Sequence, residues 1–216
     1  MTPSTHRNAG PGPCISYSLT DTPLGRMLLG ATDRGVCAVK FGEDAALVQE
    51  LAADFPRATL TCDAEAIAPY ARAVLDHFGG RGAILDLALD VHGTVFQERV
   101  WAALREIPYG QTRSYGEVAQ MIGEPGAARA VGRACASNPT ALAVPCHRVV
   151  RSGGALSGYR WGVQIKRTLL EQERARSLGS GARWWVSGCR KGRSLHPEGR
   201  CPTERNRRRA RPGDPS

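Results

Sequence analysis

A cysteine and a histidine stand side by side within an apolar stretch, at Cys146 and His147. A thiolate is a good nucleophile, but a free thiol is mostly protonated at neutral pH, so a nearby imidazole that accepts its proton can activate it. Adjacent side chains of an extended chain point to opposite sides, so adjacency alone does not pair the two groups. Pro145 restricts the backbone before them and donates no hydrogen bond, which favours a tight turn that presents both. Spacing alone favours a buried structural cysteine over a catalytic one.

The residues around this pair extend the pattern. Asn138-Pro139 precedes the run Pro-Cys-His-Arg-Val-Val, a glycine-containing segment follows at 153–162, and Lys166, Leu170 and Glu173 share a helical face. Together these motifs resemble the O6-alkylguanine-DNA alkyltransferases, especially the C-terminal methyltransferase domain of Ada-type proteins. The resemblance runs from about residue 14 to 176 and is most specific between 94 and 173.

The resemblance implies a DNA repair reaction without a cofactor. An alkyl group on O6 of guanine, and also on O4 of thymine, would pass to Cys146 in a single irreversible turnover after the base is flipped out of the duplex. The product is a thioether with no evident leaving route, and no second thiol is obviously placed to relieve Cys146. Such a protein is a stoichiometric methylated-DNA-[protein]-cysteine S-methyltransferase.

The resemblance also assigns roles to individual residues. Cys146, a water, His147 and Glu173 would form a proton relay, Asn138 would brace the turn before the reactive loop, and Tyr115 would donate a hydrogen bond to the base. The arginine that matches Arg129 would enter the base stack from a helix in the minor groove. The substrate and DNA contacts that we expect are Ala128, Arg129, Val149, Tyr159, Arg160 and Lys166. Without the resemblance, Lys166 and Glu173 are interpreted as a solvated helical stripe, as most such pairs are.

Two other classes of protein remain open from the residues. A non-catalytic DNA-binding protein, either a regulator or a lesion sensor, would keep the fold but lack the reactive cysteine. A Cys-His hydrolase would need an oxyanion hole, and no signature of the known thiol hydrolases is visible. Ser157 and Trp161 stand where some family members have glycine, so we expect methyl groups to be accepted better than benzyl-sized groups.

Composition limits the cellular setting. Seven cysteines at irregular spacing do not form a disulfide framework, and no segment resembles a secretory leader or a bilayer span. We therefore expect a monomer in the bacterial cytosol or nucleoid, with double-stranded DNA as partner and no membrane contact. Cys14 and Cys37 lack a complete set of metal-ligand partners. Neither the cysteine-rich zinc module nor the AraC-like region of full Ada proteins is present, which argues against transcriptional activation by this chain alone.

The net charge of +9 is concentrated outside the expected fold. Ten Lys and Arg against three acids lie in 177–216, which leaves only +2 for residues 1–176. The tail lacks periodicity, which predicts disorder and at most salt-sensitive, sequence-independent affinity for DNA. Three possible zinc ligands in it, Cys189, His196 and Cys201, are loosely spaced and make a poor set. The basicity is thus weak evidence for what the folded part binds.

The elements that must position these residues form two halves. Short segments at 15–20, 26–31 and 36–41 separated by turn residues predict an antiparallel meander, and helices are expected from 44 to before Pro56 and over 67–78. A further strand is expected over 84–91. This half offers no phosphate loop or catalytic cluster and is interpreted as a scaffold.

The second half is helical. Capping boxes at Thr94-x-x-Gln97 and Ser114-x-x-Glu117 begin two helices, a turn follows at 123–126, and a third helix is expected over 127–136. The helix-turn-helix order and the bare surface of the third helix, with Arg129 and Arg133 on one face, favour nucleic acid, although a packed core helix fits equally well. A last helix is expected over 163–176.

The predicted class is therefore α+β. A small antiparallel sheet with helices (ribonuclease H-like) would be followed by a mostly helical, winged-helix-like domain. The expected divisions are a disordered lead-in at 1–13, a scaffold domain at 14–92, a DNA-binding and transfer domain at 93–176 and a basic tail at 177–216.

Overall fold

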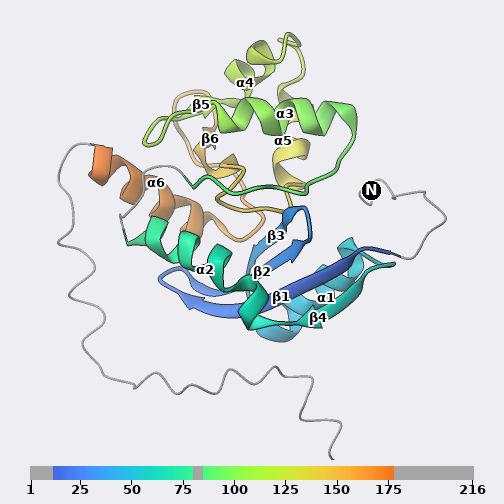
Figure 1. Cartoon of the computed structure of the whole chain (residues 1–216). Helices are drawn as coiled ribbons and strands as arrows, with labels where there is room; N and C mark the ends of the chain where they lie inside the picture. Colours follow the sequence, from blue (N-terminus) through green and yellow to red (C-terminus); the bar gives the residue numbers. More distant parts are fainter. Residues whose placement is uncertain (1–11, 80–84, 178–216) are drawn as a thin grey trace, which may run out of the picture. The chain divides into compact units, whose positions relative to one another are not determined.

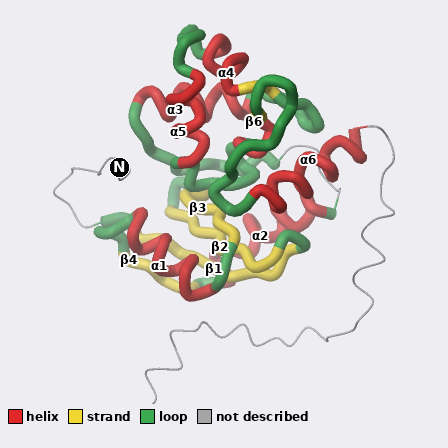
Figure 2. Tube along the Cα trace, turned by 180° about the vertical axis from the view of Figure 1, so that it is seen from behind, coloured by secondary structure: helices red, strands yellow, loops and turns green. Residues whose placement is uncertain are grey.

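The computed structural model describes residues 12–79 and 85–177 (Figures 1 and 2). The strands and helices of the first half are β1 (Cys14–Thr22), β2 (Gly25–Thr32), β3 (Gly35–Phe41), α1 (Asp44–Asp54), β4 (Thr59–Cys62) and α2 (Ala64–Phe78). Those of the second half are α3 (Val95–Arg105), β5 (Arg113–Ser114), α4 (Tyr115–Met121), α5 (Ala128–Ala136), the 3-10 turn η1 (Cys146–Arg148), β6 (Val149–Val150) and α6 (Val163–Ser177). The expectations for 1–11, for the tail beyond 177 and for its zinc ligands lie outside the described residues.

The first half is a four-stranded sheet with a helix on each face. The strand order is β3-β2-β1-β4, antiparallel except for the parallel pair of β1 and β4. Met27 and Leu29 of β2 pack in one cluster with Val74 of α2, whereas Gly30 faces Leu51 of α1. Alternation along a strand therefore places α2 and α1 on opposite faces, and Figure 2 shows α1 from the side hidden in Figure 1. The predicted meander and its two helices are confirmed.

Backbone from both halves of the chain covers the open edge of β3. The Val39 amide donates to the Pro139 carbonyl at 3.0 Å, and the Ala141 amide donates to the Val39 carbonyl at 3.0 Å. Val36 is bonded in the same way to the strip at 88–90. The backbone just before the reactive loop is thus anchored to the sheet, because these amides and carbonyls satisfy one another.

The second half is a small helical cluster. Both expected capping boxes are present, with Thr94 accepting from the Gln97 amide and Ser114 from the Glu117 amide. The α4–turn–α5 arrangement packs on α3 through a shared apolar core that includes Val118 and Val131. The predicted helix-turn-helix and the α+β class are confirmed.

One prediction about the scaffold was wrong, and one strand was not predicted. The described part of the expected strand, 85–91, forms only an isolated bridge between Leu89 and Val36. In addition, Thr59–Cys62 is a strand that the pattern did not predict, since it is short and mostly exposed and is defined by pairing with β1. No helix among the described residues is long and apolar enough to cross a membrane.

Candidate active site

Asn138 fixes the shape of the loop that presents the thiol. Its Nδ2 donates to the Val144 carbonyl at 2.8 Å and to Cys146 Sγ at 3.2 Å, while its Oδ1 accepts from the Thr140 amide at 3.0 Å. Asn138, Thr140 and Cys146 are all buried. Between them, Leu142 has a left-handed φ of 68°, which is unusual for a branched residue and marks a tightly constrained turn. Asn138 thus ties both ends of this turn together and directs an N–H toward the sulfur.

The expected turn at Cys146 is present as η1, directly after Pro145. Burial raises the pKa of the Cys146 thiol, while the Asn138 hydrogen bond and the charge of Lys166 act in the opposite direction. The net shift is upward, so the thiol is protonated at neutral pH. Attack by this sulfur must therefore be accompanied by removal of its proton.

His147 is the available base. Burial lowers the pKa of His147, and the hydrogen bond to Glu173 only partly offsets this effect, so the imidazole is neutral at pH 7. Its Nε2 lies 2.8 Å from Glu173 Oε1, and a neutral ring donates there because the carboxylate can only accept. Nδ1 then carries the free lone pair, and this buried atom makes no hydrogen bond with the described residues. Nδ1 is the atom that can take up a proton.

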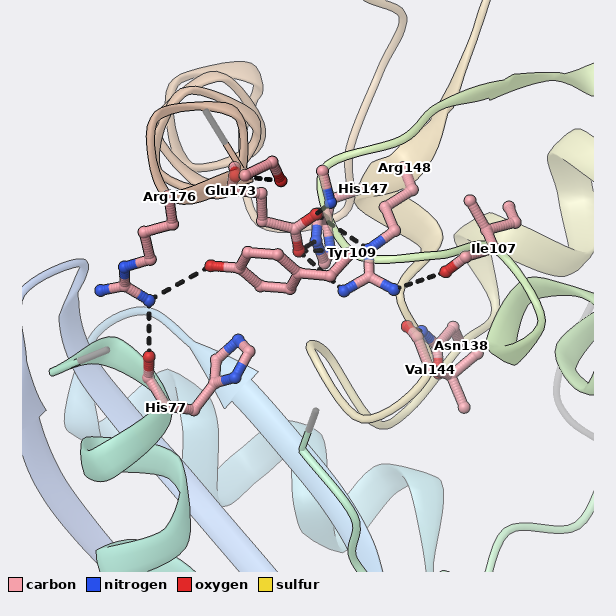
Figure 3. Close-up of polar contacts among 11 residues, drawn as sticks. His77, Ile107, Tyr109, Asn138, Val144, His147, Arg148, Glu173 and Arg176 are labelled. Atoms are coloured by element: carbon pink, nitrogen blue, oxygen red, sulfur yellow. Dashed lines mark hydrogen bonds and ion pairs between the residues drawn. The ribbon is translucent and has the colours of Figure 1, made fainter. Parts of the chain in front are cut away.

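Glu173 is held from several sides (Figure 3). Arg148 Nε donates to Glu173 Oε2 at 2.9 Å and Nη2 donates to Oε1 at 2.9 Å, and the Gly110 amide donates to Oε2 at 3.0 Å. Burial opposes the ionisation of Glu173, but the contacts with His147 and Arg148 outweigh it and lower the pKa of the carboxyl to about 2. Since His147 is neutral, it supports the carboxylate at rest through its hydrogen bond, and Arg148 supplies the full positive charge. Glu173 is thus an ionised, oriented carboxylate behind the imidazole.

Lys166 and Glu173 are buried rather than part of a solvated stripe. Lys166 Nζ donates to the Val149 carbonyl at 2.6 Å, beneath the reactive loop. This position corrects the expectation for Lys166, because a side chain with 1% of its surface exposed does not offer its charge to DNA. Val149, another of the expected substrate contacts, thus has its carbonyl bonded to Lys166.

A pocket of about 420 Å³ opens onto the thiol. Its lining residues are Tyr115, Gly132, Cys135, Ala136, Cys146, Gly158, Tyr159 and Arg160. Tyr115, expected to contact the base, and Tyr159, an expected substrate contact, therefore share a cavity with Cys146. The Tyr159 hydroxyl is buried without a well-aligned hydrogen bond, and its pKa is raised by burial and by the nearby Cys146. Such a hydroxyl stays protonated and can donate to a bound group.

Arg160 lies at the pocket but is partly engaged by the scaffold. Its Nη2 is 3.3 Å from Glu50 Oε2 and 3.6 Å from Asp54 Oδ2, both on α1. Buried Lys40 pairs with the same two acids, at 3.4 and 2.5 Å. Arg160 therefore has charged partners of its own in addition to the pocket that it lines.

The expected DNA residues of α5 lie apart from the buried relay. Arg129 is exposed and Ala128 is half-buried in the first turn of α5, while Gly132 of the same helix borders the pocket beside Tyr115. One helix therefore carries an exposed cation and also lines the cavity that contains the thiol. Among the described residues no cluster of three or more His, Cys, Asp or Glu could hold a metal ion.

Sequence reasoning missed two residues of this site, Arg148 and Cys135, and the contact that Ser157 makes. Arg148 binds Glu173, Ser157 Oγ lies 2.6 Å from Tyr115 Oη, and Cys135 is a second thiol in the pocket wall. Arg148 directly follows the Cys-His pair, and its long guanidinium side chain was the available signal for a carboxylate partner. Nothing local to Ser157 or Cys135 indicated the contacts that they make.

A small α+β unit joined to a helix-turn-helix unit, with a buried Cys-His-Glu set at a pocket, is the arrangement of a DNA alkyltransferase. Two family models match: "6-O-methylguanine DNA methyltransferase, ribonuclease-like domain" over residues 15–91, and "6-O-methylguanine DNA methyltransferase, DNA binding domain" over residues 95–175. The methylated-DNA–protein-cysteine methyltransferase of Mycolicibacterium paratuberculosis is 41% identical over 166 residues, which are 77% of this chain and 96% of the relative. The chain therefore belongs to the methylated-DNA–protein-cysteine methyltransferase family.

Two further relatives show the extent of the likeness. The bifunctional transcriptional activator/DNA repair enzyme Ada of Escherichia coli is 45% identical over 174 residues, covering 80% of this chain and 49% of that protein. The chain thus spans about half the length of the first curated relatives that it matches. The crystal structure of Mycobacterium tuberculosis OGT in complex with DNA has a TM-score of 0.66 at 41% identity, over 74% of this chain and 94% of that chain.

Proposed function

We propose that this protein repairs DNA by transferring a methyl group from O6 of guanine to Cys146. The observation that carries the proposal is the position of Cys146 Sγ in the wall of a pocket, 3.2 Å from Asn138 Nδ2. The next residue in the chain is His147, which is bonded to Glu173. Two of the relatives support it, because one is named a methylated-DNA–protein-cysteine methyltransferase and another was crystallised in complex with DNA.

The transfer step balances as a nucleophilic displacement. Cys146 Sγ forms a bond to the methyl carbon while the carbon–O6 bond breaks and its electron pair passes to the purine. The thiol proton goes to His147 Nδ1, directly or through one water, and Glu173 stabilises the imidazolium. Tyr115 Oη donates a hydrogen bond to the purine as negative charge develops, and a solvent proton then neutralises the leaving base. The thioether that results is stable, so each molecule reacts once.

The DNA-binding part of the proposal places α5 in the minor groove. Its small residues permit close approach, and Arg129 would fill the space of the flipped nucleotide, as the family resemblance implies. Minor-groove edges carry little sequence information, which suits a protein that must find a lesion in any sequence. We also propose action on O4-alkylthymine, a monomeric state, a cytosolic or nucleoid location, and a functional division near residues 92–93.

Labelled methyl transfer tests the proposal. The full chain is incubated with duplex DNA carrying O6-[methyl-³H]methylguanine, and the label is mapped to a peptide by mass spectrometry. Label saturating near one equivalent on the peptide with Cys146, and abolished by Cys146→Ala, is the expected result. Cys135→Ala is the matched control, because Cys135 lines the same pocket but burial strongly raises its thiol pKa. Tight lesion binding without transfer would contradict the proposal and indicate a sensor, whereas turnover beyond one equivalent would indicate a hydrolase.

A further inference from the structure

Arg176 joins the helix that carries Glu173 to the far end of α2. The two residues are three apart on α6, so they lie on neighbouring parts of one helical face. Arg176 Nη1 donates to the His77 carbonyl at 2.7 Å and to Tyr109 Oη at 3.2 Å, and its Nη2 donates to the Phe78 carbonyl. Figure 3 shows the side chain extending from α6, with its guanidinium bonded to both Tyr109 and His77.

The carbonyls that Arg176 binds are those of a helix terminus. His77 and Phe78 are the last two residues of α2, and carbonyls in the last turn of a helix lack partners within the helix. They also carry the partial negative charge of the helix C-terminus, which attracts a cation. A guanidinium with several fixed N–H groups can bind two such carbonyls at once, whereas an ammonium is a point charge without this fork.

Tyr109 connects the same arginine to the other side of Glu173. The ring of Tyr109 lies against the Arg148 guanidinium at 5.5 Å, and the buried His77 ring packs edge-on against it at 5.8 Å. Arg148 in turn binds both oxygens of Glu173 and donates to the Ile107 carbonyl at 2.7 Å. Arg176 therefore reaches Glu173 in two ways, along α6 and through Tyr109 and Arg148.

We infer that Arg176 is a positioning residue for the transfer reaction: by docking the last turn of α6 on the carbonyl end of α2, it sets the Glu173 carboxylate against His147. The inference rests on the proposed function. It gives the first half of the chain a part in the chemistry, since α2 supplies the fixed point from which the carboxylate is placed. The 2.8 Å contact of Glu173 with His147 tolerates little movement of α6.

Single-turnover kinetics test this role in the full chain. Arg176→Ala, Arg176→Lys and Tyr109→Phe are compared with wild type at saturating methylated duplex, and the rate constant is fitted separately from the final amount of methylated protein. We expect Arg176→Ala to lower the rate constant by about 10- to 100-fold, the cost of a displaced catalytic group, with the amplitude still near one methyl per folded molecule. Arg176→Lys should recover part of the rate. Tyr109→Phe should lower the rate constant less than Arg176→Ala, because the aromatic ring still lies against Arg148.

Arg174→Ala is the matched control, because Arg174 is an exposed arginine on the same helix, and its rate constant should match that of wild type. A positioning role also moves the acid limb of the pH–rate profile to lower pH, since the contact with Glu173 is what raises the pKa of His147 against its burial. A lower amplitude with unchanged rate constant and unchanged pH profile would overturn the inference and leave Arg176 a purely structural residue. If Arg176→Ala does not fold, Arg176→Lys decides by the same criteria. Absence of transfer by wild type would refute the proposed function itself.

Discussion

Ser157 Oγ lies 2.6 Å from Tyr115 Oη, at the pocket that contains the thiol. Burial raises the pKa of Tyr115, so the phenol keeps its proton at neutral pH, and either hydroxyl can be the donor in this pair. The side chain that occupies space beside the pocket is therefore also bonded to the group that would contact the base.

Ser157 should limit the size of the alkyl group that reacts. Ser157→Gly, which empties this space, is expected to raise the rate on O6-benzylguanine relative to O6-methylguanine by about tenfold, a typical effect of a few added or removed atoms in a pocket. Single-turnover rates on both substrates give the ratio. Ser157→Ala keeps most of the bulk and should leave the ratio unchanged, and Ser152→Gly in the exposed part of the same loop is a control. Equal rates of wild type on the two substrates would refute the prediction.

The pH dependence should reflect a neutral thiol and a neutral imidazole. Burial lowers the pKa of His147 below 6.5, so the base stays available on acidification to that pH and is lost only below it, when the imidazolium forms. The pKa of Cys146 is raised above 9.0, so the thiol stays protonated between pH 6.5 and 8 and its ionisation does not increase the rate there. Single-turnover rates should therefore be level over this interval and fall below it. A rate that already declines between pH 8 and 6.5 would mean that the base titrates higher.

Features defined by neighbouring residues could be predicted from the sequence. Each capping box joins residues three apart, Thr94 with Gln97 and Ser114 with Glu117, and the turn at Cys146 follows from the restrictions of Pro145. The strand at 59–62 could not be predicted, because its exposed residues become a strand only by pairing with β1 some 45 positions earlier in the chain.

The same distinction between neighbouring and distant residues applies to the site. The pattern and the resemblance placed Cys146, His147 and Glu173 in one relay, and the structure brings the last two into contact. The partners of the relay come from contacts across the fold, such as Arg148 with Glu173 and Lys166 with Val149, which no local spacing specifies. Because nothing near Lys166 in the sequence indicates its contact with Val149, the sequence alone predicts Lys166 as a surface residue.

Lys166→Met should slow transfer without weakening DNA binding. The substitution leaves the Val149 carbonyl unpaired in a buried position and removes a positive charge that lowers the pKa of Cys146, so the thiol loses its proton less readily. We expect unchanged affinity for unmodified duplex in a fluorescence anisotropy titration, with a single-turnover rate reduced about tenfold, equivalent to 1.4 kcal/mol in the barrier. Weaker binding with an unchanged rate would restore the interpretation of Lys166 as a DNA contact.

Asn138→Ala should destabilise the reactive loop. It leaves the buried Thr140 amide without its partner, and it removes the N–H that faces Cys146 Sγ. The Val144 carbonyl loses one of its two donors and keeps the backbone amide of Cys146 at 2.8 Å. The expected loss is about 3 kcal/mol in the free energy of unfolding, from one unsatisfied buried group and one lost hydrogen bond, measured by urea denaturation. Thr140→Val, which removes only the hydroxyl contact with Asn138, should cost about 1 kcal/mol. Equal losses in the two variants would argue against a bracing role for Asn138.

Arg129 should act on the flipping of the base and not on methyl transfer itself. It is exposed on α5, away from the buried Cys146, His147 and Glu173, so its removal leaves the relay intact. Flipping costs a few kcal/mol, and Arg129→Ala is therefore expected to lower the rate on methylated duplex by roughly 10- to 100-fold at saturating DNA. The rate on the free base O6-methylguanine, which needs no flipping, should be unchanged. Arg133 is an exposed arginine one turn further along α5. Arg133→Ala should weaken the binding of all duplexes alike, and its rate at saturating DNA should fall less than that of the Arg129 variant. Equal losses of Arg129→Ala on duplex and free base would instead place its effect in the pocket.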